Sequence, residues 1–230
     1  SHVDIVRIAS NINHVQGSLS SIEYLASKGY QVCLNIMQIS EAIPDDVSKC
    51  LALLADSSLT VLYFADSMGS MNNSDIESII DVIKAYWPNS IGIHTHDNIG
   101  LALSNTLHAI KSGVEWVDST VTGMGRGAGN ARTEELCLEL APLRGDQLSI
   151  LKLMALIENH FYPLKQLYKW GTNVYYYLAG KHSIHPTYIQ NMLQDSRFST
   201  ADRFSVINYL QKSGSNSFSA DALHNARQIY

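Results

Sequence analysis

The sequence has 230 residues, of which 46% are hydrophobic and 16% are charged. This composition is typical of a globular protein with a large core, and it argues against a disordered chain or a coiled coil. The formal net charge of −5 argues against nucleic acid or an anionic membrane surface as a partner. No apolar run approaches the roughly 18 residues that a membrane-spanning helix needs.

The chain contains three cysteines, Cys33, Cys50 and Cys137, and no two of them have CxxC spacing. An odd number of widely spaced cysteines is typical of free, buried thiols in a reducing compartment. We therefore expect a cytoplasmic protein without a disulfide framework.

Strands and amphipathic helices alternate through the first part of the chain. Short apolar runs predict five strands, at residues 3–9, 30–37, 59–65, 90–96 and 114–120. Apolar residues at helical spacing predict the intervening helices: one that ends at Gly29, one that Pro44 opens, one at 73–86 with Asn73 as its N-cap, one at 101–112, and one from about Thr133.

Strands that alternate with helices of this length indicate βα units and a parallel sheet in an α/β fold. The connections should be right-handed. Five such strands fit either part of a (β/α)8 barrel or a doubly wound sheet.

The pattern changes after about Gly145, and no further strand is predicted. Apolar and aromatic residues predict helices instead, including patches at 186–193 and 202–211. We therefore divide the chain into a strand–helix domain at 1–145 and a C-terminal helical region at 146–230.

The strongest candidate site is the run His94-Thr95-His96-Asp97-Asn98 at the end of the fourth predicted strand. Because side chains alternate along a strand, His94 and His96 are expected to point to the same face. Two imidazoles on one face can chelate a divalent metal such as Mn, Zn, Co or Mg, with carboxylate and water completing the shell. Two hydrogen-bonded histidines without a metal are the alternative.

A second candidate is the glycine-rich run from Gly123 to Ala131, after the fifth predicted strand. Glycines let the backbone approach a ligand and leave amide groups available to anions. Arg126 could pair with a substrate carboxylate or phosphate, and Asn130 could reach a metal or orient a ligand. A flexible connector with a solvated arginine is the alternative.

A third candidate is Asp66-Ser67-Met68-Gly69, at the end of the third predicted strand. A carboxylate, a hydroxyl group and backbone amides gather there near a helix start, which suits a substrate carboxylate. Helix capping by Asp66 or Ser67 is the alternative.

In order and spacing, these motifs resemble those of the DRE-TIM metallolyase family, and most closely its 4-hydroxy-2-oxovalerate aldolases. The resemblance covers about 60% of the chain. The matching runs are Asp4-Ile5-Val6-Arg7-Ile8-Ala9, Tyr63-Phe64-Ala65-Asp66-Ser67-Met68-Gly69, His94-Thr95-His96-Asp97-Asn98-Ile99-Gly100-Leu101, and Val117-Asp118-Ser119-Thr120 through Gly125-Arg126-Gly127-Ala128-Gly129-Asn130-Ala131.

The resemblance implies a (β/α)8 TIM barrel with a divalent metal, usually Mn, at its mouth. It gives His94 and His96 the role of metal ligands and places Asn130 beside the metal. It also places Ser67 where the aldolases hold the pyruvate carboxylate, and Tyr175 at the site of their catalytic tyrosine.

The resemblance also implies a partial barrel. The five predicted strands correspond to the fourth to eighth strands of the family, so the first strand, with its Arg-Asp pair and nearby base, is expected to lie outside this chain. A partial barrel exposes sheet edges that another segment must cover. We therefore expect this chain to be inactive by itself.

Two further departures concern substrate and partner. The cysteine-containing loop of the HMG-CoA lyases is missing, which argues against that substrate. The C-terminal region is unlike the tail with which the oxovalerate aldolases dock an aldehyde dehydrogenase, which argues against that partner.

The expected activity is cleavage of a 4-hydroxy-2-oxo acid to pyruvate and an aldehyde, with the metal stabilising the enolate. Two alternatives stay open: a Claisen-type synthase that condenses an acyl-CoA with a 2-oxo acid, and a non-catalytic barrel. The expected partner is a small 2-oxo acid, and the sequence is compatible with a homo-oligomer.

Overall fold

The computed structural model describes residues 2–42, 44–145 and 150–228. It divides into two compact units. The strand unit comprises Ser1–Ser67, Met71–Thr95 and Ser104–Asp118, and the helical unit comprises Met68–Ser70, His96–Leu103 and Ser119–Tyr230. The predicted domain boundary adjoins residues 146–149, which lie outside the described residues.

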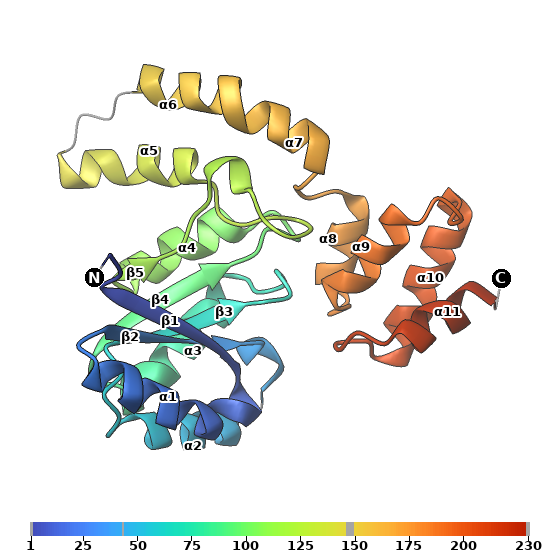
Figure 1. Ribbon diagram of the computed structural model, residues 1–230. Helices are drawn as coiled ribbons and strands as arrows, with labels where there is room; N and C mark the ends of the chain where they lie inside the picture. Colours follow the sequence, from blue (N-terminus) through green and yellow to red (C-terminus); the bar gives the residue numbers. More distant parts are fainter. Residues whose placement is uncertain (1, 43, 146–149, 229–230) are drawn as a thin grey trace. The chain divides into compact units, whose positions relative to one another are not determined.

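The strand unit contains a five-stranded parallel sheet in the order β1-β2-β3-β4-β5 (Figure 1). Its strands are β1 (Ile5–Asn11), β2 (Gln31–Met37), β3 (Val61–Asp66), β4 (Ser90–Thr95) and β5 (Trp116–Val117). Each strand pairs with the next one in the chain, whereas the order of a doubly wound sheet reverses at a switch point. The predicted α/β class is therefore confirmed, with the sequential strand order of a TIM barrel.

Several predicted boundaries differ from the structure, including both ends of β1, and two of these differences have a clear structural cause. The fifth strand is only two residues long, because after Asp118 the chain leaves β4 and Thr120 pairs with Arg132 instead. The N-cap of α3 is Asn72 rather than Asn73, since the Asn72 side chain accepts hydrogen bonds from the backbone N–H groups of Ser74 and Asp75. Both errors concern ends of elements, where local sequence constrains the backbone least.

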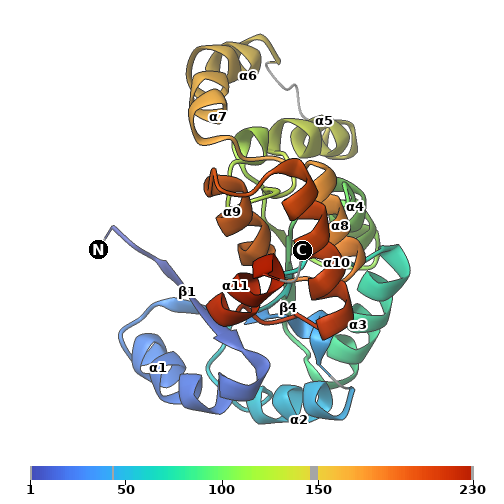
Figure 2. The same cartoon turned by 90° about the vertical axis from the view of Figure 1, so that its right-hand side faces the viewer.

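Helices cover one face of the sheet. The helices and short 3-10 turns between the strands are η1 (Ile12–His14), α1 (Val15–Ser27), η2 (Ile39–Glu41), α2 (Pro44–Leu54), α3 (Asn73–Tyr86) and α4 (Ala102–Lys111). In Figure 2, α1 and α2 lie side by side against the strands. Alternate strand residues point toward these helices and form the main hydrophobic core, in which Leu34, Leu62 and Phe64 are fully buried.

The opposite face of the sheet is mixed in character. Cys33, Val61 and Tyr63 form a small buried cluster there, with Trp116 packed against it. The ring of Tyr63 lies over Gly92, where an added β-carbon would come about 2.5 Å from the ring. The absence of a side chain at residue 92 therefore makes room for Tyr63.

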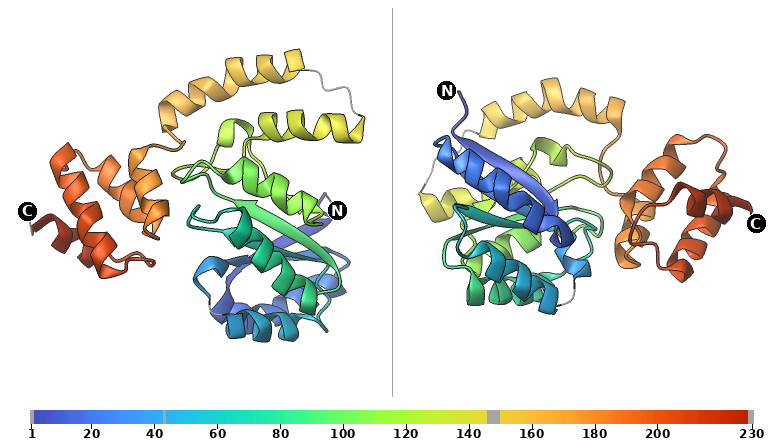
Figure 3. Two further views of the ribbon diagram at one scale, coloured as in Figure 1. Left: turned by 180° about the vertical axis from the view of Figure 1, so that it is seen from behind. Right: turned by 60° about the horizontal axis from the view of Figure 1, so that its bottom comes forward.

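The helical unit holds η3 (Val121–Gly123), α5 (Thr133–Arg144), α6 (Ile150–Leu156), the π-helix η4 (Ile157–Phe161), α7 (Tyr162–Tyr168), α8 (Val174–Lys181), α9 (Pro186–Gln194), α10 (Thr200–Ser213) and α11 (Ala220–Gln228). Figure 3 shows α6, η4 and α7 as one continuous rod and α8 to α11 as a bundle. The bundle has its own core, which includes Tyr188, Ile189 and Leu210. The prediction of a helical C-terminal region is confirmed. Within the described residues, no helix is both long and apolar enough to cross a membrane.

Candidate functional site

The predicted ligand His94 is held by an ion-pair chain on the mixed face of the sheet. Its Nδ1 lies 2.8 Å from a carboxylate oxygen of Asp118. The guanidinium of Arg7 approaches the same carboxylate, at 2.7 and 2.9 Å from its two oxygens. A carboxylate accepts the proton of Nδ1, so Nε2 is the nitrogen through which His94 would bind a cation.

The ion-pair chain of Arg7, Asp118 and His94 keeps Asp118 ionised. Burial alone would raise the pKa of Asp118, but hydrogen bonds from His94 and Arg7 outweigh burial, and the pKa lies below its usual value. The Arg7 guanidinium also lies 4.7 Å from the centre of the Tyr63 ring. Burial raises the pKa of Tyr63 to about 12, so its hydroxyl stays protonated.

Sequence reasoning missed Arg7 and Asp118 as site residues. The register of the sheet places Arg7 and His94 on one face. Arg7 pairs with Cys33, Cys33 with Val61, and Ala65 with His94. Residues paired in this way, or two apart along a strand, share one face. The register can point to Arg7 only once the order of the strands is known, and the sequence alone does not give that order.

The second predicted ligand, His96, lies in the helical unit and forms an isolated antiparallel bridge with Asn130. The neighbouring Asp97 N–H donates to Gly129 O at 3.0 Å. Asn130 is 8% exposed and donates through Nδ2 to Met124 O at 3.3 Å. Its Oδ1 is buried and has no hydrogen-bond partner among the described residues. A buried oxygen without a donor suits a cation or a ligand N–H or O–H group.

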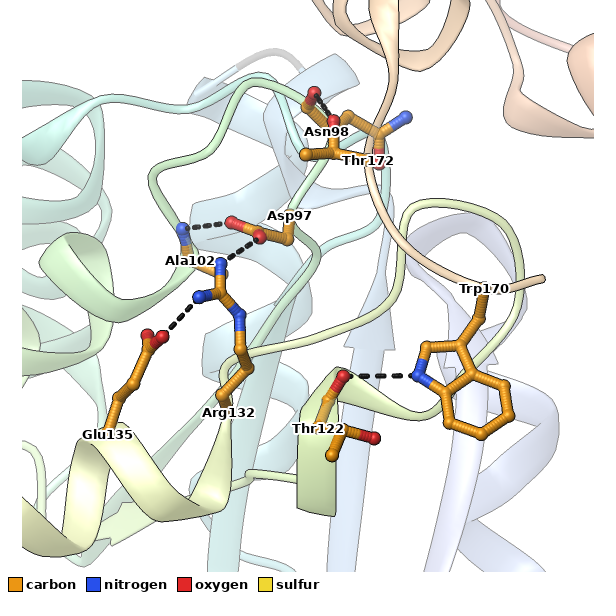
Figure 4. Close-up of polar contacts among 8 residues, drawn as sticks. All are labelled: Asp97, Asn98, Ala102, Thr122, Arg132, Glu135, Trp170 and Thr172. Carbon is orange, nitrogen blue, oxygen red and sulfur yellow. Dashed lines mark hydrogen bonds and ion pairs between the residues drawn. The ribbon is translucent and has the colours of Figure 1, made fainter. Parts of the chain in front are cut away.

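Asp97 joins the loop after β4 to the glycine-rich loop. One carboxylate oxygen accepts the backbone N–H of Ala102 at 3.1 Å, which caps α4 (Figure 4). The other is 3.3 Å from a guanidinium nitrogen of Arg132, which also pairs with Glu135. Both oxygens of this buried carboxylate therefore hold structure, one at the start of α4 and one at Arg132.

The glycine-rich loop is folded tightly against itself. Gly129 has φ of +83°, and a β-carbon there would clash with the carbonyl oxygen of Gly123. Asn130 N–H donates to that same carbonyl at 3.3 Å. The loop is therefore an ordered turn that fixes Asn130.

The remaining predicted residues have the following positions. The Ser67 hydroxyl accepts the N–H of Gln38 at 2.9 Å within the strand unit. Arg126 is exposed and lies close enough to His185 that, together with the larger effect of burial, it lowers the pKa of His185. Tyr175 packs in the helical bundle, 5.5 Å from the ring centre of Phe204. These roles stay predictions.

A cavity of about 620 Å³ lies in the helical unit. Its walls include Asp97, Asn130, Arg132, Trp170 and Thr172, with Lys165 and Lys169 from the α7 side. Asn130 therefore borders a space that a small molecule could enter. Among the described residues, no three His, Cys, Asp or Glu side chains gather as a metal site.

Comparison with known proteins gives the family. The HMGL-like family model matches residues 3–159. The chain belongs to the HMGL-like family. It is similar to the 4-hydroxy-2-oxovalerate aldolase of Carboxydothermus hydrogenoformans, with 31% identity over 160 residues. These residues cover 69% of this chain and 48% of the relative. The chain spans about half the length of the curated aldolases it matches.

Solved structures extend the likeness to the fold. The N-terminal domain of a candidate aldolase from Bacteroides vulgatus is 30% identical, with a TM-score of 0.77 over 84% of this chain and 64% of that one. The carboxyl transferase domain of Rhizobium etli pyruvate carboxylase is 16% identical, with a TM-score of 0.74 over 98% of this chain and 42% of that one. The second likeness shows fold alone, and it includes the helical region of this HMGL-like chain.

Proposed function

We propose that this HMGL-like chain is part of a metal-dependent aldolase that cleaves a 4-hydroxy-2-oxo acid to pyruvate and an aldehyde. The observation that carries the proposal is the pairing of His94 with Asp118, in a chain whose relatives include aldolases. An imidazole fixed through Nδ1 by a carboxylate is the usual arrangement of a metal-binding histidine.

The proposed ligands are His94, His96 and Asn130. Two imidazoles and an amide oxygen suit a divalent cation of intermediate hardness, with Mn²⁺ as the first choice and Zn²⁺, Co²⁺ or Mg²⁺ as others. The buried, unpartnered Oδ1 of Asn130 fits this assignment. When bound, the cation would supply Lewis-acid polarisation of the 2-oxo group.

The other proposed roles concern the substrate. Arg126 and the backbone near Ser67 would hold its carboxylate, since a guanidinium and amide N–H groups are the donors that carboxylates prefer. Tyr175 would donate the proton that the pyruvate enolate takes up at its terminal carbon, after the 4-hydroxyl has lost its proton to a base and the bond to the aldehyde carbon has broken. Arg7 acts indirectly, because it keeps Asp118 ionised and oriented toward His94.

The test uses the full-length protein with Mn²⁺ and a 4-hydroxy-2-oxo acid. Pyruvate release that depends on the metal is the expected result. The double variant His94→Ala, His96→Ala should lose stoichiometric metal, whereas His108→Ala, which removes an imidazole from α4 near Glu77, should retain it. Undiminished metal in the double variant would end the ligand assignment.

A second assay separates the lyase from the synthase. The protein is incubated with an acyl-CoA and a 2-oxo acid, and free thiol is measured. Thiol release without pyruvate release from the hydroxy acid would replace the aldolase proposal by the synthase.

A further inference from the structure

Three consecutive residues of the helical unit tie two loops together. Trp170 Nε1 donates to Thr122 O at 3.1 Å, and Thr172 Oγ1 donates to Asn98 O at 2.8 Å (Figure 4). Between them, the Gly171 N–H donates to Gly127 O at 3.0 Å. We call Trp170–Thr172 the strap. Its contacts reach both the loop that follows His96 and the glycine-rich loop that carries Arg126 and Asn130.

A helix cap flanks the strap on each side. At one end, Lys169 ends α7 in the left-handed region, with φ of +56°. Gly171 has φ of +124°, which L side chains rarely adopt, so this position favours glycine. At the other end, the Asn173 side chain caps α8 by accepting the N–H groups of Tyr175 and Tyr176. The strap is therefore anchored to a capped helix on each side.

Helix α8 packs directly against the same loops. An added β-carbon at Gly180 would lie 2.8 Å from Ile99 Cγ2 and 3.0 Å from Asn98 Cβ. Four residues earlier on the same side of the helix, Tyr176 approaches Gly127, where an added β-carbon would lie 3.0 Å from its ring. One face of α8 therefore touches both loops that the strap joins.

We infer that the strap and α8 are a positioning device, which holds the His96 loop and the glycine-rich loop in one arrangement. The strap adds to the contacts that the glycine-rich loop makes with itself, and glycines make such a loop costly in conformational entropy to order. Thr172, Trp170 and Gly180 are positioning residues that act through Asn98, Thr122 and Ile99. The inference rests on the proposed function only where metal affinity is measured.

The first experiment compares two glycine-to-alanine changes in helices. Gly180→Ala inserts a methyl group between α8 and the Asn98–Ile99 turn, whereas Gly17→Ala in α1 has nothing within 4 Å. Hydrogen–deuterium exchange is followed in peptides that cover residues 96–100 and 121–130. We expect exchange there to rise roughly tenfold in Gly180→Ala and to stay unchanged in Gly17→Ala. Equal exchange in the two variants would overturn the inference.

The second experiment removes single hydrogen bonds without inserting atoms. Thr172→Val deletes the hydroxyl that reaches Asn98 O, and Thr172→Ser restores it. The valine variant should show faster exchange in residues 96–100, and the serine variant should return to the wild-type rate. A valine variant that exchanges like the wild type would contradict the role of Thr172.

The third comparison uses two buried indoles. Trp170→Phe and Trp87→Phe each remove one N–H donor to a backbone carbonyl, Thr122 O in the helical unit and Ser90 O in the strand unit. Both should lower the melting temperature, but only Trp170→Phe should speed exchange in residues 121–130 and weaken Mn²⁺ binding, by at least several-fold. Weaker binding in both variants would mean that the effect is general destabilisation.

The exchange readout separates this inference from the proposed function. If wild-type protein binds no Mn²⁺, the aldolase proposal fails while the exchange comparison still tests the strap. If Mn²⁺ binds and the exchange rates do not differ, the strap inference fails while the aldolase proposal stands.

Discussion

The two faces of the sheet carry different kinds of side chain, although the same strands form both. The helix-covered face is mostly apolar, and Ile93 on β4 is fully buried there. Its neighbour His94 points to the other face and joins Asp118 and Arg7 in an ion-pair chain. One face therefore stabilises the fold, and the other holds charged groups in fixed positions. A strand carries both kinds of information because its side chains alternate.

The largest effect is expected on the helix-covered face. Phe64→Ala would leave a cavity among α2, α3 and the central strands, and it should lower the free energy of unfolding by about 3–5 kcal/mol. Chemical denaturation measures this change. Mn²⁺ affinity of the folded protein should stay near the wild-type value. A loss of affinity larger than the loss of stability would show that the two faces are not independent.

A smaller effect is expected where the mixed face is tightly packed. Gly92→Ala would place a methyl group against the Tyr63 ring and should destabilise the protein by about 1–3 kcal/mol. In a Tyr63→Leu background the same change should be milder, since the ring is gone. Additive effects in this double-mutant cycle would argue that Tyr63 does not rest on Gly92.

The sequence predicts more of the helix-covered face of the sheet than of the mixed face. Apolar runs such as residues 59–65 mark the strands, and their alternation with helices gives the parallel sheet. The two-histidine motif also stands out. The partnership of His94 with Asp118 does not, because residues 94 and 118 are brought together by strand pairing between β4 and β5.

The hydrogen-bond partners of the strap are even harder to predict from the sequence. Trp170 and Thr172 donate to carbonyl groups of Thr122 and Asn98, which are 48 and 74 residues away. Backbone carbonyls leave no trace in residue type, so nothing in the local sequence marks the acceptors. An aromatic stretch near Trp170 predicts burial but not its partner.

A third effect concerns the centre of the ion-pair chain. Asp118→Asn removes the charge that Arg7 and His94 share, at groups that water partly reaches, so the loss of stability should be about 1 kcal/mol. Mn²⁺ affinity should fall by about 10–100-fold, because the His94 ring loses the carboxylate that orients it. Isothermal titration calorimetry measures this fall. Glu115→Gln, which removes a carboxylate that accepts from Ser90, is the matched control and should leave affinity unchanged.

The smallest effect is expected at Arg7, the outermost residue of the ion-pair chain. Arg7→Met keeps much of the side-chain length but removes the charge beside Asp118 and above the Tyr63 ring. Because the side chain is 38% exposed, the combined ion pair and cation–π contact should contribute only about 0.5–1 kcal/mol.

Salt and a second substitution separate the two contributions of Arg7. Added salt weakens an exposed ion pair, so the effect of Arg7→Met on unfolding should shrink as ionic strength rises. In the Asp118→Asn background only the contact with Tyr63 is left, and the substitution should then have less than half its original effect. An undiminished effect would mean that Arg7 acts through packing against Tyr63. Asp118 would then orient His94 without help from Arg7, and the charged face would reduce to a single pair.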